Sequence, residues 1–179
     1  MIEPEPIEVG EWTLRPPRAD DAAWIYDACQ DAEIARWTRV PSPYTARDAV
    51  EFLQRSATQW ADGSGCSFVI AATETGELVG TVALMRFSDG AGATASVAEI
   101  DYWLALDGRG RGAATAAVRG ISHWAAHRLG LERLEATVAI GNEASEAVLA
   151  RCGFTCVDRQ SSCDTPRGDV PASRWQLVL

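Results

Sequence analysis

Hydrophobic and polar positions follow two different periods along this chain, and the periods predict strands and helices. Alternating positions or short apolar runs predict strands over residues 11–15, 67–72, 78–85, 97–104, 134–140, 154–159 and 173–179. Apolar positions three or four residues apart predict helices over residues 20–29, 45–62, 112–129 and 142–152. This order predicts the α/β class, with a mixed sheet that carries helices on both faces. No internal repeat or linker interrupts it, so a single domain is expected over residues 1–179.

Residues typical of helix ends and loops predict where several of these elements begin and end. Thr45 is followed three residues later by Asp48, an acidic variant of the capping box, and Gly63 supplies a helix stop. Residues 36–44 contain two prolines and are predicted to form a loop. Small and polar residues predict a flexible connection over 88–96 and a polar loop over 160–172.

The composition narrows the class of partner. Twenty-five acidic and sixteen basic side chains give a net charge of −9, which repels a nucleic-acid backbone, so no nucleic-acid partner is expected. No apolar run approaches the roughly 18 residues of a membrane span, so no membrane partner is expected. Five cysteines without a CxxC pair, and a first segment unlike a signal peptide, predict a reducing, cytoplasmic location.

The segment over residues 102–115 is the most informative for chemistry. It has the pattern of a strand end, a glycine-rich turn and a helix start. Such a turn directs backbone N–H groups and a helix dipole towards an anion such as a pyrophosphate, and Arg109 and Arg111 add positive charge. The glycines lack the GxGxxG spacing and no GKS or GKT is present, which disfavours a Rossmann site and a P-loop. A turn without a ligand remains the alternative for these residues alone.

Residues 109–114, with the sequence Arg-Gly-Arg-Gly-Ala-Ala, match the signature R/Q-x-x-G-x-G/A of the GNAT acetyltransferase superfamily. Further segments follow in the order of its RimJ/RimL-like branch, at residues 14–22, 75–80, 98–104, 141–145 and 153–154. The chain therefore resembles this branch over nearly its whole length. The resemblance implies the GNAT acyl-CoA N-acyltransferase fold, with a central twisted, mostly antiparallel sheet. It also implies acetyl-CoA as co-substrate and no metal.

The resemblance places the acetyl-CoA site around the signature loop. Loop amides would hold the pyrophosphate, and the exposed backbone of the preceding strand would bond the pantetheine arm as an added strand does. The residues assigned to this site are Trp103, Leu104, Ala105, Arg109, Gly110, Arg111, Gly112, Ala113, Ala114, Thr115 and Asn142. Asparagine is also a favoured N-cap, so capping alone remains the alternative for Asn142.

Acetyl transfer to an amine needs a base for the ammonium proton and a donor for the leaving thiolate. Glu99 lies where many GNAT members place a general base, and Asp101 shares its strand face by period two. Asp101 is assigned to hold a cationic acceptor, although both carboxylates would be plain surface charges if that face met solvent. Leu149 stands where many members carry a tyrosine acid. Ser145, which resembles a serine of the RimL-like branch, is therefore the proposed thiolate donor, with an ordinary helix-start serine as the alternative.

In this family the first two helices and the last hairpin loop form the acceptor pocket. Trp37 and Tyr44 are accordingly assigned to bind an amine through cation–π and stacking contacts, with loop anchoring as the alternative. His123 and His127 are four residues apart on a predicted helix, but no third ligand is evident, so no metal site is expected.

These observations predict an N-acetyltransferase that moves an acetyl group from acetyl-CoA to a primary amine in a ternary complex. The acceptor is either the N-terminal α-amine of a protein or peptide, as the resemblance implies, or a small amine such as an antibiotic. A non-catalytic acyl-CoA-binding module and an enzyme for a longer acyl-CoA remain alternatives. The family also suggests a homodimer.

Overall fold

A computed structural model describes residues 3–88 and 96–179 and arranges them around one eight-stranded sheet. The strands are β1 (Ile7–Val9), β2 (Trp12–Arg15), β3 (Cys66–Ala72), β4 (Leu78–Ser88), β5 (Val97–Leu104), β6 (Arg133–Ala139), β7 (Thr155–Thr165) and β8 (Gly168–Val178). Their order across the sheet is β1-β2-β3-β4-β5-β6-β8-β7. Strands β5 and β6 run parallel, and the other neighbouring pairs run antiparallel. The prediction of a mixed, mostly antiparallel sheet is therefore confirmed.

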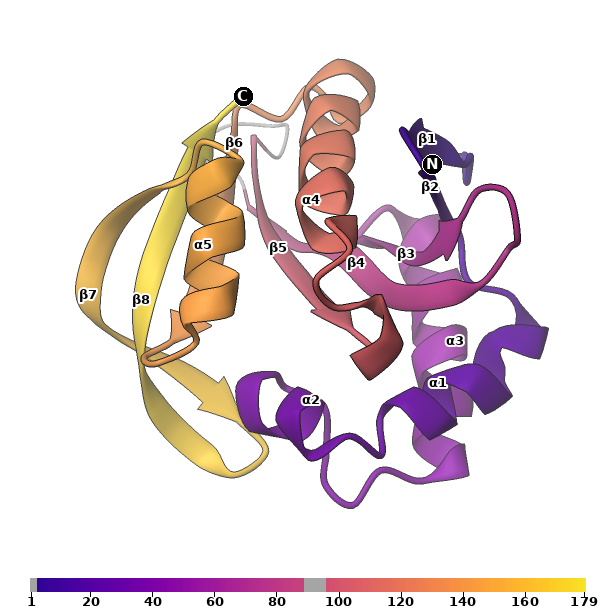
Figure 1. The fold of residues 1–179 in the computed structure, drawn as a ribbon. Helices are drawn as coiled ribbons and strands as arrows, with labels where there is room; N and C mark the ends of the chain where they lie inside the picture. The colour runs from indigo at the N-terminus through magenta and orange to yellow at the C-terminus, as the bar shows by residue number, and fades with distance from the viewer. Residues whose placement is uncertain (1–2, 89–95) are drawn as a thin grey trace.

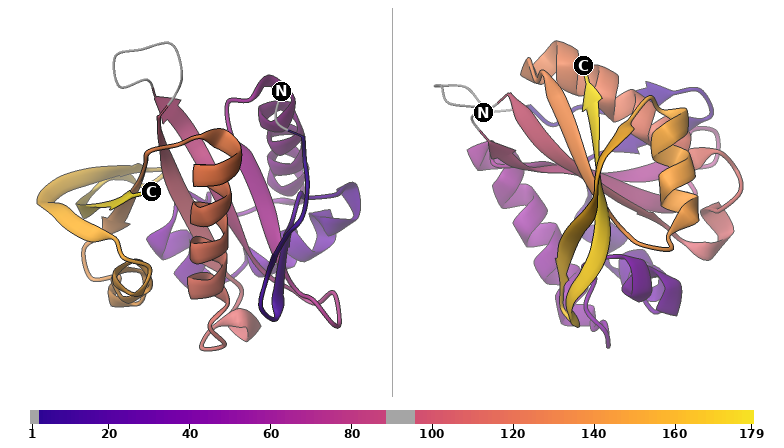
Figure 2. Two further views of the ribbon diagram at one scale, coloured as in Figure 1. Left: turned by 90° about the horizontal axis from the view of Figure 1, so that it is seen from above. Right: turned by 90° about the vertical axis from the view of Figure 1, so that its left-hand side faces the viewer.

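Helices cover both faces of this sheet (Figures 1 and 2). On one face lie α4 (Ala113–Trp124), which continues into the π-helical turn η3 (Ala125–Leu129), and α5 (Glu143–Arg151). On the other lie α1 (Ala22–Ala28), α2 (Ala32–Trp37) and α3 (Ala46–Asp62). Two 3-10 turns, η1 (Ala19–Asp21) and η2 (Leu106–Gly108), precede α1 and α4. The prediction of helices on both faces is also confirmed.

Strand β5 takes part in the packing on both faces. Its Ile100 and Tyr102 belong to the main core, which includes buried residues of α4 and α5. Its Trp103 packs instead against a second cluster that contains Ile25 and Tyr44. Because side chains alternate along a strand, the acidic positions 99 and 101 lie on the same face as Trp103.

The sheet opens between β5 and β6. The two strands pair only over their first residues, with Glu99 opposite Glu135 as the last pair. Beyond that point β5 stays paired with β4 while β6 stays paired with β8. A Cβ at Gly80 of β4 would lie 2.4 Å from the Trp103 carbonyl oxygen, so a glycine is required for this close β4–β5 approach. The end of β5 is thereby held against β4 and away from β6.

The structure corrects the sequence-based boundaries at two elements near the N-terminus. Strand β1 was not predicted, and it pairs with β2 through Ile7 and Leu14. Residues 36 and 37, expected in a loop, end the short helix α2. Its N-cap is Asp31, whose side chain accepts from the Glu33 N–H. Six residues are too few to show a helical period in the sequence.

The C-terminal segment also differs from the expectation. Most of the predicted polar loop over 160–172 is strand, because β7 and β8 form a long hairpin with only residues 166–167 between them. Its many polar side chains are explained by exposure, since most of β7 is exposed or half-buried. Pro171 lies just beyond the last β6–β8 pair, Ala139 with Ala172, and its carbonyl accepts from the Ile140 N–H. The predicted flexible connection over 88–96 lies almost wholly outside the described residues.

Asp21 joins the end of β2 to the first helices, and we expect its charge to stabilise the fold. Arg15 donates two hydrogen bonds to its carboxylate, at 2.9 and 2.7 Å, and the Arg18 N–H donates a third at 2.7 Å. Burial opposes the charge, but these bonds and the Arg15 charge hold the pKa of Asp21 below its ordinary value. A lowered pKa means that the stabilisation is present at neutral pH and is lost as the pH falls below about 4.

Asp21→Asn is therefore expected to lower the free energy of unfolding at pH 7 by about 3 kcal/mol, as for breaking a buried ion pair. Urea denaturation at pH 7 and pH 3 measures this, and the difference from wild type should shrink at pH 3. The exposed neighbour Asp20→Asn is the matched control, with little effect at either pH. An equal loss for Asp21→Asn at both pH values would contradict the ionic origin.

Candidate active site

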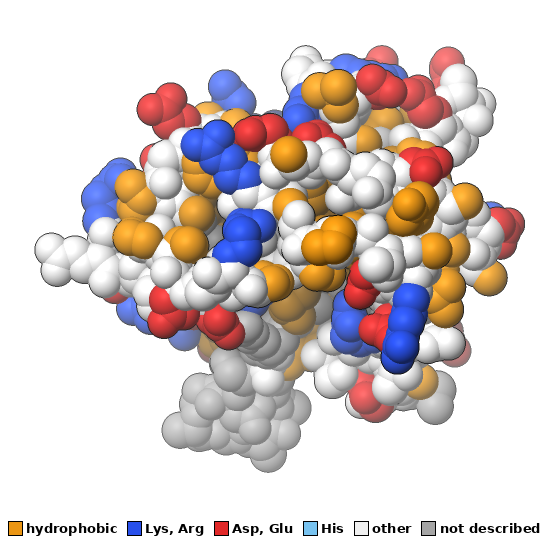
Figure 3. All heavy atoms as spheres, turned by 90° about the horizontal axis from the view of Figure 1, so that it is seen from below, with side chains coloured by type: hydrophobic (Ala, Val, Ile, Leu, Met, Phe, Trp, Pro, Cys, Tyr) orange, Lys and Arg blue, Asp and Glu red, His pale blue; other side chains and the backbone are white. Residues whose placement is uncertain are grey.

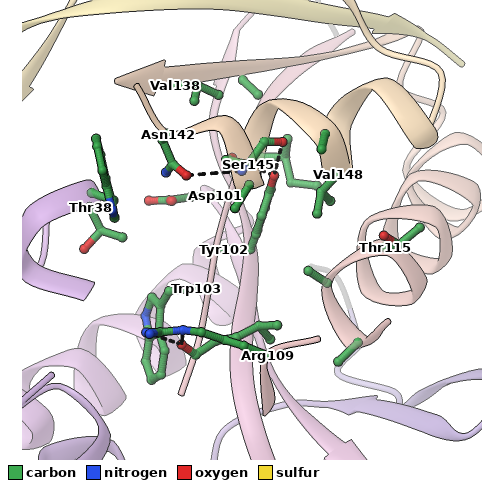
Figure 4. Close-up of a pocket in the computed structure, with 18 of the residues that line it drawn as sticks. Thr38, Asp101, Tyr102, Trp103, Arg109, Thr115, Val138, Asn142, Ser145 and Val148 are labelled. Carbon is green, nitrogen blue, oxygen red and sulfur yellow. Dashed lines mark hydrogen bonds between the residues drawn. The ribbon is translucent and has the colours of Figure 1, made fainter. Parts of the chain in front are cut away.

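The opening between β5 and β6 forms a cavity of about 950 Å³, called here the large cavity. It is lined by residues 100–104 of β5, 136–138 of β6, the loop and first two turns of α4, one side of α5 and part of α2. Figure 4 shows labelled members of this lining from β5, α4 and α5. Segments far apart in the sequence therefore enclose one site.

The loop before α4 supplies unpaired backbone donors to the large cavity. Gly110 and Gly112 adopt φ angles of +74° and +80°, which favour glycine. The Ala116 N–H donates to the Gly112 carbonyl, so the N–H groups of residues 113–115 precede the helical ladder of α4. Residues 112–116 all line the cavity. This end of the cavity is suited to a phosphate or pyrophosphate.

The two signature arginines point their guanidinium groups at protein partners. Arg109 donates to the Leu104 carbonyl and, at 2.6 Å, to Asp31 at the start of α2. Arg111 pairs with Glu77 at 3.3 Å and lies over the ring of Trp12. Of the two, Arg109 lines the large cavity and Arg111 does not. The contribution of the two guanidinium groups to the anion site stays a prediction.

The three strand residues assigned to the pantetheine arm differ in their surroundings. Trp103 and Leu104 line the large cavity. The Leu104 carbonyl already accepts from Arg109, at 3.1 Å to Nη2. Ala105 is not among the lining residues, and its N–H donates to the Val79 carbonyl of β4. Contact with a ligand stays a prediction for all three.

A second cavity, of about 570 Å³, lies on the α1–α3 side of β5 and is called here the small cavity. Four residues line both cavities: Thr38, Asp101, Tyr102 and Trp103. Trp103 also stacks on Trp24 of α1, with ring centroids 5.8 Å apart. The two cavities therefore meet at the end of β5.

Arg39 joins the two acidic residues of β5 where the cavities meet. Its Nη2 donates to Glu99 Oε1 at 2.8 Å and to Asp101 Oδ2 at 3.2 Å. The Glu99 side chain is 14% exposed and lines neither cavity, whereas that of Asp101 is 34% exposed and lines both. The cluster places the Asp101 carboxylate where a cation in either cavity can approach it.

Ser145, in the first turn of α5, is hydrogen-bonded to a tyrosine of β5. Its Oγ lies 2.8 Å from the Tyr102 hydroxyl, and both residues line the large cavity (Figure 4). Its N–H donates to Asn142 Oδ1 at 3.2 Å, so Asn142 is the N-cap of α5 and also lines the cavity. Leu149, at the position of the missing tyrosine, is fully buried in the main core.

Trp37 and Tyr44, assigned to the acceptor, border different cavities. Trp37 lines the large cavity, donates to Glu33 Oε2 at 2.8 Å and carries the Arg36 guanidinium over its ring. Tyr44 lines the small cavity but is 9% exposed and packs in the second core cluster. The loop-anchoring alternative thus describes the packing of Tyr44, and acceptor binding stays a prediction for both.

Sequence reasoning missed several polar residues of the site. Arg39 falls in a segment expected to be a loop, and no local pattern connects it to acids 60 residues away. Arg119 and Arg151 also line the large cavity and add positive charge there. Tyr102 had a usable signal, because period two places it on the face opposite Asp101.

The face shown in Figure 3 mixes acidic and basic side chains, with hydrophobic ones between them. Within residues 3–88 and 96–179, no helix is long and apolar enough to cross a membrane. The same ranges contain no group of three or more His, Cys, Asp or Glu that could hold a metal ion.

Comparison with known proteins identifies the class of this site. Residues 12–155 match the acetyltransferase (GNAT) domain family, and the chain belongs to this family of acyltransferases. A solved structure of RimL, the ribosomal L7/L12 α-N-protein acetyltransferase in complex with coenzyme A, has the same fold with a TM-score of 0.85. It is 18% identical and covers 98% of each chain.

Two relatives are more similar in sequence. RimJ of Mycobacterium smegmatis, solved in complex with CoA-disulfide, is 26% identical with a TM-score of 0.79 and covers 98% of this chain and 86% of that one. YdaF of Bacillus subtilis is 46% identical over 57 residues, which is 32% of this chain and 31% of the length of YdaF. The resemblance to the RimJ/RimL-like branch is thus confirmed.

Proposed function

We propose that this protein transfers an acetyl group from acetyl-CoA to a primary amine, and that the amine is the N-terminal α-amino group of a protein or peptide. The observation that carries the proposal is the meeting of two cavities at Asp101 and Trp103, with an anion site at the far end of one of them. A donor and an acceptor can then approach β5 from opposite sides. Direct transfer in a ternary complex needs this arrangement.

The large cavity is the proposed acetyl-CoA site. Backbone amides of residues 113–115 suit the pyrophosphate, and Arg119 and Arg151 suit further phosphate charge. The separated edge of β5 suits the pantetheine arm, which hydrogen-bonds as an added strand does. The coenzyme A bound by RimL and RimJ supports this assignment.

In the proposed reaction the amine nitrogen attacks the thioester carbon. A C–N bond forms, the C–S bond breaks, and the bonding electron pair stays on sulfur. Glu99 receives the amine proton through water, while Asp101 attracts the cationic acceptor to the shared end of the cavities. Ser145 passes its hydroxyl proton to the sulfur and regains one from water. The cationic acceptor thus loses two protons: one reaches sulfur through Ser145 and water, and the other passes through Glu99 to solvent.

The small cavity is the proposed acceptor site. The cationic form of the acceptor suits the carboxylate of Asp101, which lines both cavities. The α-amine of a chain terminus is preferred over a small amine because the RimL relative is named for that acceptor. A cytoplasmic location and a homodimer stay predictions.

Thiol release from acetyl-CoA, measured against a panel of amines, tests the proposal. The panel contains short peptides of varied N-terminus, the same peptides with a blocked N-terminus, aminoglycosides and polyamines. Turnover of the free peptides but not of the blocked ones is expected. Turnover confined to a small amine would show that the acceptor is a small amine and not the α-amine of a chain terminus. Binding of acetyl-CoA without turnover of any amine would contradict the proposed reaction and favour a binding module.

A further inference from the structure

Tyr102 directs its hydroxyl to a single residue of another element. The hydroxyl lies 2.8 Å from Ser145 Oγ and 3.3 Å from the Ser145 carbonyl oxygen. These residues are 43 positions apart, on β5 and on the first turn of α5. The contact bridges the two sides of the large cavity, where β5 and β6 have already separated.

The direction of this hydrogen bond decides what the Ser145 hydroxyl can do. Either hydroxyl can be the donor in the 2.8 Å contact, whereas the Ser145 carbonyl at 3.3 Å only accepts. When Tyr102 donates to Ser145 Oγ, the hydroxyl proton of Ser145 is not used in this contact and can be directed elsewhere.

Neighbouring residues also fix the backbone position and the side-chain rotamer of Ser145. Its N–H is bound by the Asn142 cap, which sets its backbone position in the first turn. What the cap leaves undetermined is the side-chain rotamer, and the Tyr102 contact determines it. Leu149 carries no hydroxyl and is buried in the core, so it cannot take over this role.

We propose that Tyr102 is a positioning residue: it holds Ser145 Oγ by donating to it, and thereby aims the Ser145 proton into the large cavity at the sulfur that leaves. This inference rests on the proposed function. Burial raises the pKa of Tyr102 above its ordinary value. Tyr102 is therefore protonated at neutral pH and can donate to Ser145 Oγ. The donated bond also polarises the Ser145 hydroxyl as charge develops.

The test is a double-mutant cycle on Tyr102→Phe and Ser145→Ala, with kcat and the KM for acetyl-CoA measured across pH. Tyr102→Phe is expected to lower kcat about fivefold, as for one hydrogen bond, with the KM unchanged. In the Ser145→Ala background it should have no further effect on kcat. The loss should be greatest at high pH, where solvent is the poorer source of a proton for sulfur. Tyr26→Phe, on α1, is the matched control, and melting temperatures of all variants report folding.

Each other outcome overturns a different statement. If Ser145→Ala lowers kcat but Tyr102→Phe does not, the positioning role is wrong and the role of Ser145 stands. If the two effects add, Tyr102 acts independently of Ser145 and the inference is wrong. If Ser145→Ala has no effect, the proposed donor and its positioning residue are both wrong. A wild-type protein without turnover on any amine overturns the proposed function, and this inference with it.

Discussion

Gly112→Glu is expected to raise the Kd for acetyl-CoA at least about 100-fold, because a like charge beside a phosphate costs several kcal/mol and each 1.4 kcal/mol is tenfold. Gly112 directly precedes the unpaired amides of α4 and lines the large cavity. A Cβ there meets no atom within 4 Å, so the new side chain has room beside the loop amides. Isothermal titration with acetyl-CoA measures the effect.

Two comparison variants separate charge from backbone strain. Gly112 has a φ of +80°, and a non-glycine residue in this region costs roughly 1–2 kcal/mol. Gly112→Ala carries the same strain without the charge, so its Kd should change much less. Gly63→Glu carries a similar strain, at a φ of +76°, at the far end of α3, and acetyl-CoA binding should be unchanged. Normal affinity of a folded Gly112→Glu protein would contradict the anion site.

Glu99→Gln is expected to lower kcat about 100-fold or more, the usual contribution of a positioned general base. The amide keeps the size of the side chain but cannot take the ammonium proton. Because Glu99 lines neither cavity, the KM for acetyl-CoA should stay close to that of wild type. The rise of kcat with pH on the acidic side, which reports deprotonation of the base, should also disappear.

Asp101→Asn distinguishes the two carboxylates of this cluster. Asp101 lines both cavities, so its loss should raise the KM for a cationic acceptor more than it lowers kcat. Glu74→Gln, in the exposed turn after β3, is the matched control and should leave both parameters unchanged. An unaltered kcat and pH profile for Glu99→Gln would remove Glu99 from the role of base. If Asp101→Asn then lost the acidic limb, that role would pass to Asp101.

Elements whose signals are local could be predicted from the sequence. Thr45 and Asp48 form both hydrogen bonds of the expected capping box, and Gly63 ends α3 with a left-handed φ. Strand β5 has the predicted bounds of 97–104. In each case the deciding interactions join residues a few positions apart, so the pattern of side chains contains the information.

Elements that depend on distant partners could not be predicted in this way. Helix α2 is held by contacts from other segments: Arg109 donates to its N-cap Asp31, and Arg167 donates to the Arg36 carbonyl. The polar hairpin of β7 and β8 is held mainly by backbone pairing, which leaves little trace in hydrophobicity. A short helix and an exposed hairpin therefore both resembled loops.

The candidate site likewise has features that local sequence signals predict and features that depend on distant parts of the chain. The loop over residues 109–115 could be predicted, since the positive φ angles at two glycines and the start of α4 depend on neighbouring residues. The period of a strand also predicts that residues 99 and 101 share one face. The contacts of Arg39 with these acids and of Tyr102 with Ser145 could not be predicted. Both contacts exist because β5 separates from β6, and helices from distant parts of the chain pack around the opening.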